Sequence, residues 1–153
     1  MKIIDLFCGN RAIWYNKNHP LVTYVDHRES VKPDIVADSG ELPKIIGVDY
    51  DLVILDPPHM NVGKKSDMAK QYGHYTTHEI LTTIERVGDE AHRISKESAL
   101  MVLKWNDHDI KLKKVLDLLH KWEPLCGHLT KDGPGSKTYW VLLKKWIPYG
   151  LKT

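Results

Sequence analysis

The hydrophobic residues of the chain gather in short continuous runs more often than in alternating patterns. Four such runs occupy the first third of the sequence, at residues 2–7, 21–25, 34–37 and 51–55. Continuous runs of this length are typical of parallel strands that are covered on both faces. The second and third runs are only about eight residues apart, whereas a full crossover helix needs about a dozen. We therefore expect either a bare loop at this connection or a vestigial strand.

A helical period begins after residue 75. Thr76 and Glu79 have the spacing of a capping box, which marks the start of a helix. Apolar residues then recur every three or four positions as far as Ile94, which is the pattern of an amphipathic helix. The sequence predicts one helix from Thr76 to about Lys96.

The rest of the chain continues this α/β pattern. Residues 98–105 predict a fifth strand. An apolar stripe within residues 112–119 predicts a second helix, for which Asp107 or Asp109 can serve as the cap.

The chain should close with a hairpin. Residues 123–130 and 138–146 predict two strands with no helix between them, so these strands should be antiparallel neighbours. We expect an α/β fold with a mostly parallel seven-stranded sheet and an antiparallel C-terminal hairpin. A chain of 153 residues suits a single domain over residues 1–153, with no separate target-recognition domain.

Composition changes this picture little, but charge is unevenly placed. The net charge is only +2, yet residues 111–153 contain nine lysines and three acidic residues. A basic end of this kind can mark a nucleic-acid face, or it can be ordinary solvated surface. Cys8 and Cys126 lack metal-ligand spacing, and no apolar run reaches the ~20 residues of a membrane span. We expect a reducing, cytoplasmic environment, with no disulfide and no membrane partner.

Acidic residues stand at several of the predicted strand ends. Asp26, Asp38 and Asp56 each follow an apolar run, and Asp5 precedes a turn at Gly9. A strand, a glycine turn and an acid about 20 residues later is the arrangement by which doubly wound folds hold an adenosine moiety. The carboxylate of Asp26 offers paired acceptors that suit ribose hydroxyls.

The most informative segment is Asp56-Pro57-Pro58-His59. It lies at the C-terminal end of the fourth run, and ligands of open α/β sheets bind at such strand ends. A carboxylate, a rigid backbone and a flat ring in one place suit the binding of a planar amino group.

These residues resemble the successive motifs of class I S-adenosylmethionine-dependent methyltransferases. The resemblance rests on Asp5-Leu6-Phe7-Cys8-Gly9, on Asp26 and Asp38, and on Asp56-Pro57-Pro58-His59, which is similar to the Asp-Pro-Pro-aromatic signature of amino-methyltransferases. The turn that contains Asn10 is similar to that of small phage or prophage-encoded methyltransferases. Specific matches cover about the first 60 residues, whereas the architecture resembles the family over nearly the whole chain.

The resemblance implies a minimal Rossmann-like methyltransferase fold that binds S-adenosylmethionine and needs no metal. Gly9 would let the backbone approach the amino-acid part of the cofactor, Asp26 would hold the ribose, and Asp38 with Ser39 would contact the adenine. The predicted cofactor-binding residues are Asp5, Phe7, Gly9, Asn10, Arg11, Asp26, Asp38 and Ser39.

The resemblance also implies a catalytic segment. Asp56 and the backbone at Pro57 would accept hydrogen bonds from the target amino group, and His59 would stack on the target ring. The predicted catalytic residues are Asp56, Pro57, Pro58 and His59. Catalysis would come mainly from positioning and electrostatics, because the sulfonium is already a strong electrophile.

Two positions depart from the family pattern. Arg11 stands where a second glycine is usual, so its side chain could crowd the cofactor, or pair with the cofactor carboxylate or with Asp5. His59 stands where Tyr, Phe or Trp is commoner. An imidazole stacks less well than these rings, but it can hydrogen-bond and it changes charge near pH ~6.5.

Residues 60–75 are polar and predict a long loop, which in compact domains is usually functional or disordered. Tyr72 and Tyr75 could stack on a flipped base. Lys64 and Lys65 could contact phosphates, and all four could equally be ordinary surface residues.

Together these features predict an N-methyltransferase that acts on an exocyclic amino group of a nucleic-acid base, with adenine in DNA favoured over RNA. The absence of room for a recognition region favours weak sequence selectivity, a homodimer, an activating partner, or recognition by the loops of residues 60–75 and 131–137. The alternatives are a methyltransferase for RNA, a protein amide or a small molecule, and a non-catalytic cofactor-binding module. A nicotinamide-binding domain is disfavoured because the Gly-x-Gly-x-x-Gly fingerprint is missing.

Overall fold

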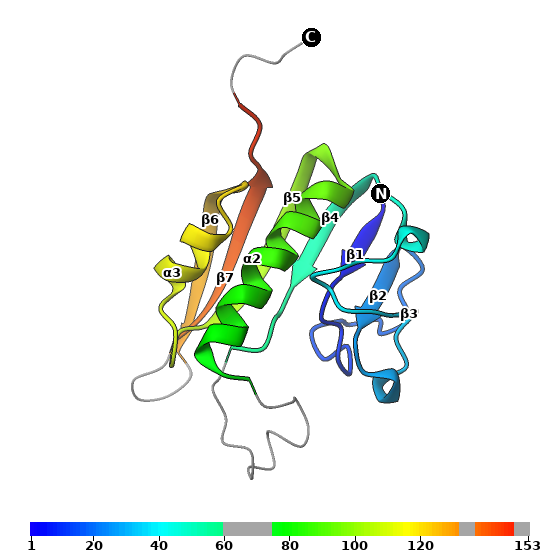
Figure 1. Ribbon diagram of the computed structural model, residues 1–153, viewed down its shortest axis with the longest axis horizontal. Coiled ribbons are helices and arrows are strands. Elements are labelled where there is room, and N and C mark those ends of the chain that lie inside the picture. The colour runs from blue at the N-terminus through cyan, green and yellow to red at the C-terminus, as the bar shows by residue number, and fades with distance from the viewer. Residues whose placement is uncertain (60–74, 132–136, 149–153) are drawn as a thin grey trace.

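A computed structural model of the chain describes residues 1–59, 75–131 and 137–148. Its centre is a seven-stranded sheet with the order β3-β2-β1-β4-β5-β7-β6 (Figure 1). The first five strands pair in parallel, and β7 runs antiparallel to both β5 and β6. The strands are β1 Ile3–Asp5, β2 Val22–Asp26, β3 Ile35–Val36, β4 Tyr50–Leu55, β5 Ser95–Asn106, β6 Trp122–Lys131 and β7 Lys137–Lys145. The predicted α/β sheet with its closing hairpin is confirmed.

The direction of winding reverses between β1 and β4. Strands β2 and β3 follow on one side of β1, whereas β4 and β5 follow on the other. In open α/β sheets the crevice at such a reversal, outside the carboxyl ends of the strands, is the usual ligand site.

Two helices, α2 (Thr77–Ile94) and α3 (Leu112–Leu118), lie on one face of the sheet (Figure 1). The predicted capping box at the start of α2 is present. The Glu79 N–H donates to Thr76 Oγ1 at 3.2 Å, and the Thr76 N–H donates to the Glu79 carboxylate at 2.7 Å. The helix stops at Ile94 because Ser95 already pairs with Tyr50 of β4.

The predicted cap of α3 is wrong. Its N-cap is Lys111, without a side-chain hydrogen bond. The carboxylate of Asp107 accepts a hydrogen bond from the backbone N–H of Lys137 at 3.2 Å, so it joins β5 to the hairpin instead of starting a helix.

The connection between β2 and β3 combines both predicted outcomes. It contains a single 3-10 turn, η1 (Glu29–Val31), and β3 is only two residues long. A second short turn, η2 (Lys44–Ile46), precedes β4. Few helices therefore cover the β1–β3 side of the molecule.

The second face of the sheet is covered only in part. A small apolar cluster that includes Tyr24 and Ile54 packs against Ile13 and Trp14, which belong to the non-helical segment after β1. Burial along β5 alternates: Trp105 on the helix side is fully buried, whereas Lys104 is half-buried. Strand β5 is therefore covered more fully on the helix side than on the other face. Among the described residues, no helix is long and apolar enough to cross a membrane.

Candidate functional site

A cavity of about 350 Å³ lies at the carboxyl ends of β1, β2, β4 and β5, where the winding reverses. Most residues predicted for cofactor binding and catalysis line it, namely Asp5, Phe7, Gly9, Asn10, Asp26, Asp56, Pro57, Pro58 and His59. Arg11, Asp38 and Ser39 do not belong to its lining. The sequence analysis missed Cys8, Ala12, Ile13, His27, Arg28 and Lys104, which also line it.

Asp5 forms the buried floor of the cavity. Its carboxylate accepts a hydrogen bond from Trp14 Nε1 at 2.7 Å and one from the backbone N–H of Phe7 at 3.2 Å. Burial raises the pKa of Asp5 to about 6, although these two hydrogen bonds oppose the rise. Asp5 therefore titrates just below neutral pH.

Gly9 carries the turn that follows β1. Its φ of 45° lies in the left-handed region, which favours glycine. Its N–H donates to Asp26 Oδ2 at 3.0 Å, and a Cβ placed on it would stand 3.5 Å from the guanidinium of Arg28. The glycine thus relieves the turn and keeps the backbone open toward the cavity.

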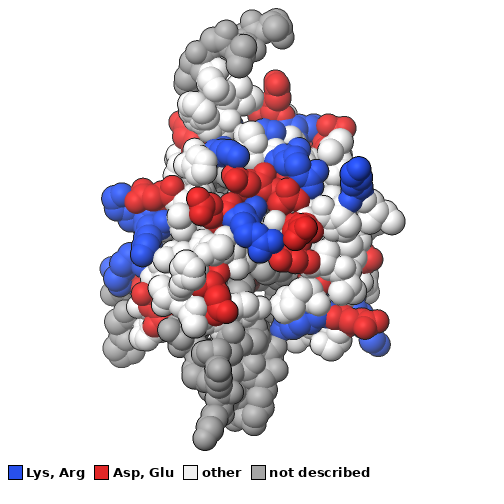
Figure 2. All heavy atoms as spheres, in the orientation of Figure 1, with Lys and Arg blue, Asp and Glu red and all other residues white. Residues whose placement is uncertain are grey.

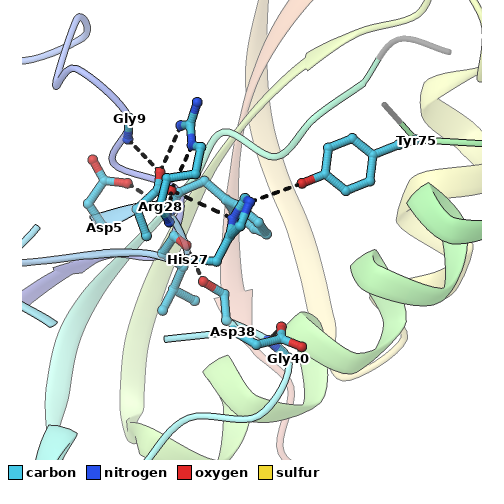
Figure 3. A network of polar contacts seen from close by, with 11 residues as sticks. Asp5, Gly9, His27, Arg28, Asp38, Gly40 and Tyr75 are labelled. Carbon is cyan, nitrogen blue, oxygen red and sulfur yellow. Dashed lines mark hydrogen bonds and ion pairs between the residues drawn. The ribbon is translucent and has the colours of Figure 1, made fainter. Parts of the chain in front are cut away.

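Arg28 holds the carboxylate of Asp26 on both oxygens (Figure 3). Oδ1 accepts from the Arg28 backbone N–H at 3.0 Å and from its Nε at 2.9 Å, and Oδ2 accepts from the guanidinium at 3.0 Å and from Gly9 N–H. A carboxylate has about four acceptor sites, so these donors occupy them all. Burial alone would raise the pKa of Asp26, but the hydrogen bonds from Arg28 and Gly9 outweigh it and hold the pKa below its usual value.

The signal for Arg28 in the sequence was weak. Arg28 stands only two positions after Asp26, but this spacing alone does not predict that the guanidinium contacts both carboxylate oxygens. Its importance for Asp26 therefore became visible only in the folded chain.

Arg11 is not among the residues that line the cavity, and its predicted contact with the cofactor stays a prediction. Its guanidinium donates to the carbonyls of Lys17 and Lys32 at 2.8 and 2.9 Å, and it lies 4.0 Å over the ring of Tyr24. It therefore ties the segment after β1 to the β2–β3 connection. The predicted pairing with Asp5 is not seen, because Trp14 and Phe7 hold that carboxylate.

Asp38 and Ser39 follow β3, outside the lining of the cavity. Asp38 accepts from Gly40 N–H at 2.8 Å and from Arg86 at 3.2 Å, and Ser39 Oγ donates to the carbonyl of Leu6. Their predicted contact with an adenine ring stays a prediction. Tyr75 does line the cavity, with its hydroxyl 3.5 Å from His27 Nε2 (Figure 3).

The catalytic carboxylate predicted from the motif lies at the cavity and is paired. Lys104 Nζ of β5 donates to Asp56 Oδ2 at 2.9 Å. The pairing follows from the parallel register of β4 and β5, in which Leu55 lies beside Leu103. The sequence signal for it was a lysine within the apolar stretch of residues 99–105.

His59 is the second member of the motif with a defined environment. Its ring meets Trp105 edge-on, with ring centroids 6.0 Å apart, and its Nδ1 lies 3.3 Å from the carbonyl of Pro57. Burial lowers the pKa of His59. The imidazole is therefore neutral at neutral pH and presents a ring beside Asp56.

The charges around the cavity leave a negative excess. Among the described residues, the lining contains the carboxylates of Asp5, Asp26 and Asp56 and the cationic side chains of Arg28 and Lys104. Above the pKa of Asp5 this set carries one more negative than positive charge, which favours a cationic ligand. In the described part of the chain, no cluster of side chains could hold a metal ion.

The predicted nucleic-acid contacts are only partly visible. Tyr72, Lys64 and Lys65 lie outside the described residues. Several lysines of the C-terminal third are in ion pairs, such as Lys113 with Asp117 at 2.8 Å and Lys121 with Asp89 at 2.8 Å. Figure 2 shows acidic and basic side chains interspersed on the face that carries α2. The excess of lysines therefore does not form one basic surface on this face.

The comparisons with known proteins agree on the fold. No protein-family model matches the sequence, and no curated protein matches it either. Among solved structures, PH0226 protein from Pyrococcus horikoshii OT3 is similar with a TM-score of 0.68 and 12% identity, over 95% of this chain and 82% of that one. The N-methyltransferase NodS from Bradyrhizobium japonicum WM9, in complex with S-adenosyl-L-homocysteine, is similar with a TM-score of 0.67 and 10% identity, over 95% and 78% of the two chains.

A nucleic-acid enzyme is also among the similar structures. The 16S rRNA (adenine(1408)-N(1))-methyltransferase W203A mutant from Catenulisporales acidiphilia is similar with a TM-score of 0.61 and 13% identity, over 96% of this chain and 86% of that one. At identities this low the likeness shows the fold alone. The chain therefore has the Rossmann-like α/β fold of S-adenosylmethionine-dependent methyltransferases.

Proposed function

We propose that the protein is an S-adenosylmethionine-dependent methyltransferase that acts on an exocyclic amino nitrogen, with adenine in DNA as the favoured acceptor. The observation that carries the proposal is the place of Asp56-Pro57-Pro58-His59 at the end of β4, beside the cavity that Gly9 and Asp26 share. The fold of the chain and the negative excess of the cavity support it.

The residues around the cavity fit the cofactor. The Gly9 turn leaves room for the amino-acid part, and the excess negative charge favours the sulfonium. Nε and the terminal nitrogen of Arg28 occupy one acceptor site on each oxygen of the Asp26 carboxylate. When the Arg28 side chain moves away, these two sites become available for the ribose hydroxyls.

When bound, the cofactor supplies an electrophilic methyl group on a sulfonium. Asp56 accepts a hydrogen bond from the target amino group. This hydrogen bond orients the lone pair of the amino nitrogen toward the methyl carbon. As the nitrogen–carbon bond formed and the carbon–sulfur bond broke, positive charge would develop on that nitrogen, and the carboxylate of Asp56 would stabilise it. The amino group then loses one proton to solvent or to the carboxylate. His59 lies beside Asp56 as a neutral ring that can pack against a planar acceptor.

Two similar structures favour RNA as the second candidate acceptor. One is the 16S rRNA adenine methyltransferase, and another is an rRNA methylase from Streptococcus thermophilus, with a TM-score of 0.60 and 13% identity. A DNA or RNA acceptor should bind less tightly as salt rises, because phosphate contacts release counterions.

The proposal is tested with labelled cofactor against separate pools of DNA, RNA, protein and small amines. We expect label in DNA, recovered as N6-methyladenine after digestion. Asp56→Ala should abolish transfer and leave cofactor affinity largely intact, because its carboxylate acts on the acceptor. Asp51→Ala, at the opposite end of the same strand, is the matched control and should remain active. Transfer by Asp56→Ala at the wild-type rate would remove Asp56 from catalysis.

A further inference from the structure

Strand β5 places a lysine directly beside the proposed catalytic carboxylate. Lys104 stands one position beyond the Leu55–Leu103 pair of the parallel ladder, level with Asp56. It points to the face opposite Trp105, because successive residues of a strand alternate between faces. Both side chains line the cavity, and they are 29% and 20% exposed for Lys104 and Asp56. The pair is therefore partly shielded from water yet open to a ligand.

The ammonium of Lys104 is held on two sides and retains donor capacity. It donates to Asp56 Oδ2 at 2.9 Å and lies 5.8 Å from the centre of the Trp140 ring. A lysine ammonium has three N–H donors and no acceptor. Within the described part of the chain, the hydrogen bond to Asp56 is the one found for this ammonium. An acceptor atom on a ligand can take another of its N–H groups.

The structure of the methyl acceptor determines which of its atoms can accept a hydrogen bond from Lys104. When an amino group donates to Asp56, the other atoms on the carbon that bears it come next to the neighbouring ammonium. In adenine that carbon also carries N1, in cytosine it carries N3, and in a primary amide it carries the carbonyl oxygen. Each of these is a hydrogen-bond acceptor. A simple alkylamine has no such atom and is protonated at neutral pH, so it would place one cation against another.

We propose that Lys104 is a specificity-determining residue that donates a hydrogen bond to the acceptor atom next to the target amino group. Asp56 and Lys104 together then recognise a paired donor and acceptor, which is the edge of an amidine or an amide. In adenine this is the N6 and N1 pair of the Watson–Crick edge. A base read in this way must be unpaired or extruded from a duplex. The proposal rests on the proposed methyl transfer to an amino group held by Asp56.

The test uses single-stranded oligonucleotides that contain one adenine, one 1-deazaadenine or one 7-deazaadenine, with labelled cofactor. The 1-deaza base lacks the N1 acceptor, whereas the 7-deaza base keeps it. For the wild-type protein, loss of N1 should lower kcat/KM by about 10- to 100-fold, because the site then holds an unpaired donor. Loss of N7 should have little effect. Should the pool assay identify cytosine as the acceptor, 3-deazacytosine replaces 1-deazaadenine.

Lys104→Met keeps the length of the side chain and removes the donor. Its kcat/KM on adenine should fall to the level of the wild-type protein on 1-deazaadenine, with no further loss on the 1-deaza base. Lys104→Arg keeps a donor and should retain part of the discrimination. Lys96→Met removes a lysine from the opposite end of β5, where Lys96 pairs with Asp51, and should keep the wild-type discrimination in full.

Three results would overturn the assignment, and they can be told apart. Discrimination between adenine and 1-deazaadenine that survives in Lys104→Met would show that another group reads N1. A fall in kcat/KM of Lys104→Met that is equal on adenine, 1-deazaadenine and 7-deazaadenine would show that Lys104 only positions Asp56. Wild-type protein that methylates no acceptor would refute the proposed function itself. Affinity for S-adenosylhomocysteine, which lacks the sulfonium charge, is measured by calorimetry for each variant; it should stay unchanged and so reports intact folding.

Discussion

Replacing Arg28 with alanine should strengthen cofactor binding and weaken the fold at the same time. The Nε and terminal nitrogen of Arg28 each take an acceptor site on a different oxygen of Asp26, at 2.9 and 3.0 Å. A ribose presents two neighbouring hydroxyls that need the same two sites. The arginine side chain therefore competes with the ribose for Asp26, and the cofactor must displace it.

The size of the effect follows from burial. The Asp26 side chain is 2% exposed and that of Arg28 is 24% exposed, so the contacts are shielded mainly on the Asp26 side. Hydrogen bonds to a charged group contribute about 1.5–3 kcal/mol, and water regains part of this when the guanidinium swings out. We expect a gain of about 1–2 kcal/mol in cofactor binding, which is about 5- to 30-fold in Kd. The free energy of unfolding should fall by about 1–3 kcal/mol, since Asp26 keeps its two backbone donors.

Calorimetric titration with S-adenosylmethionine and with S-adenosylhomocysteine measures the first effect, and urea unfolding without ligand measures the second. Arg28→Lys keeps the charge but cannot bridge both oxygens, so its Kd should lie between those of the wild-type protein and Arg28→Ala. Arg93→Ala removes an exposed pair with Glu90 and should leave Kd unchanged. A Kd for Arg28→Ala that is equal to or weaker than wild type would refute the competition between Arg28 and the ribose.

Two further predictions concern the floor and the turn of the cavity. Asp5 has a raised pKa of about 6 in the fold and about 3.8 when unfolded, so its contribution to stability is fully present below pH ~3.8 and is lost as pH rises through ~6. Urea unfolding measures the free energy of unfolding of Asp5→Asn and of the wild-type protein at each pH. The variant should become more stable relative to wild type by about 3 kcal/mol between pH ~4 and ~8. A stability difference that does not change with pH would contradict the burial of a titrating carboxyl. Gly9→Ala should lower the free energy of unfolding by about 1–2 kcal/mol, because its φ of 45° is strained for a residue with a Cβ. An unchanged unfolding midpoint for Gly9→Ala would contradict the left-handed turn.

The fold of this chain could be predicted in large part because its signals are local. The run before Asp56 has the length and composition of a buried strand, and the Thr76–Glu79 capping box needs only four residues in order. The end of α2 was placed two residues too late, since Ser95 and Lys96 have no local reason to leave the helix. They leave it because β5 pairs with β4.

Some residues of the candidate site could also be placed from local sequence signals, whereas others could not. The sequence by itself determined that Asp26 and Asp56 stand at strand ends, because each directly follows an apolar run, and that Asp5 precedes the Gly9 turn. The partners of Arg11 could not be predicted, because the carbonyls of Lys17 and Lys32 and the Tyr24 ring are brought to it by the path of a segment without helix.

Only the tertiary structure decided that the carboxylate of Asp56 meets Lys104. Lys104 and Asp56 are 48 residues apart, and the parallel register of β4 and β5 brings them to 2.9 Å. Arg28, in contrast, reaches Asp26 locally, from two positions further along the chain. Apolar runs and caps are properties of neighbouring residues, and one sequence can specify them. Ion pairs across strands depend on the register and path of distant segments, which are set when the whole sheet packs.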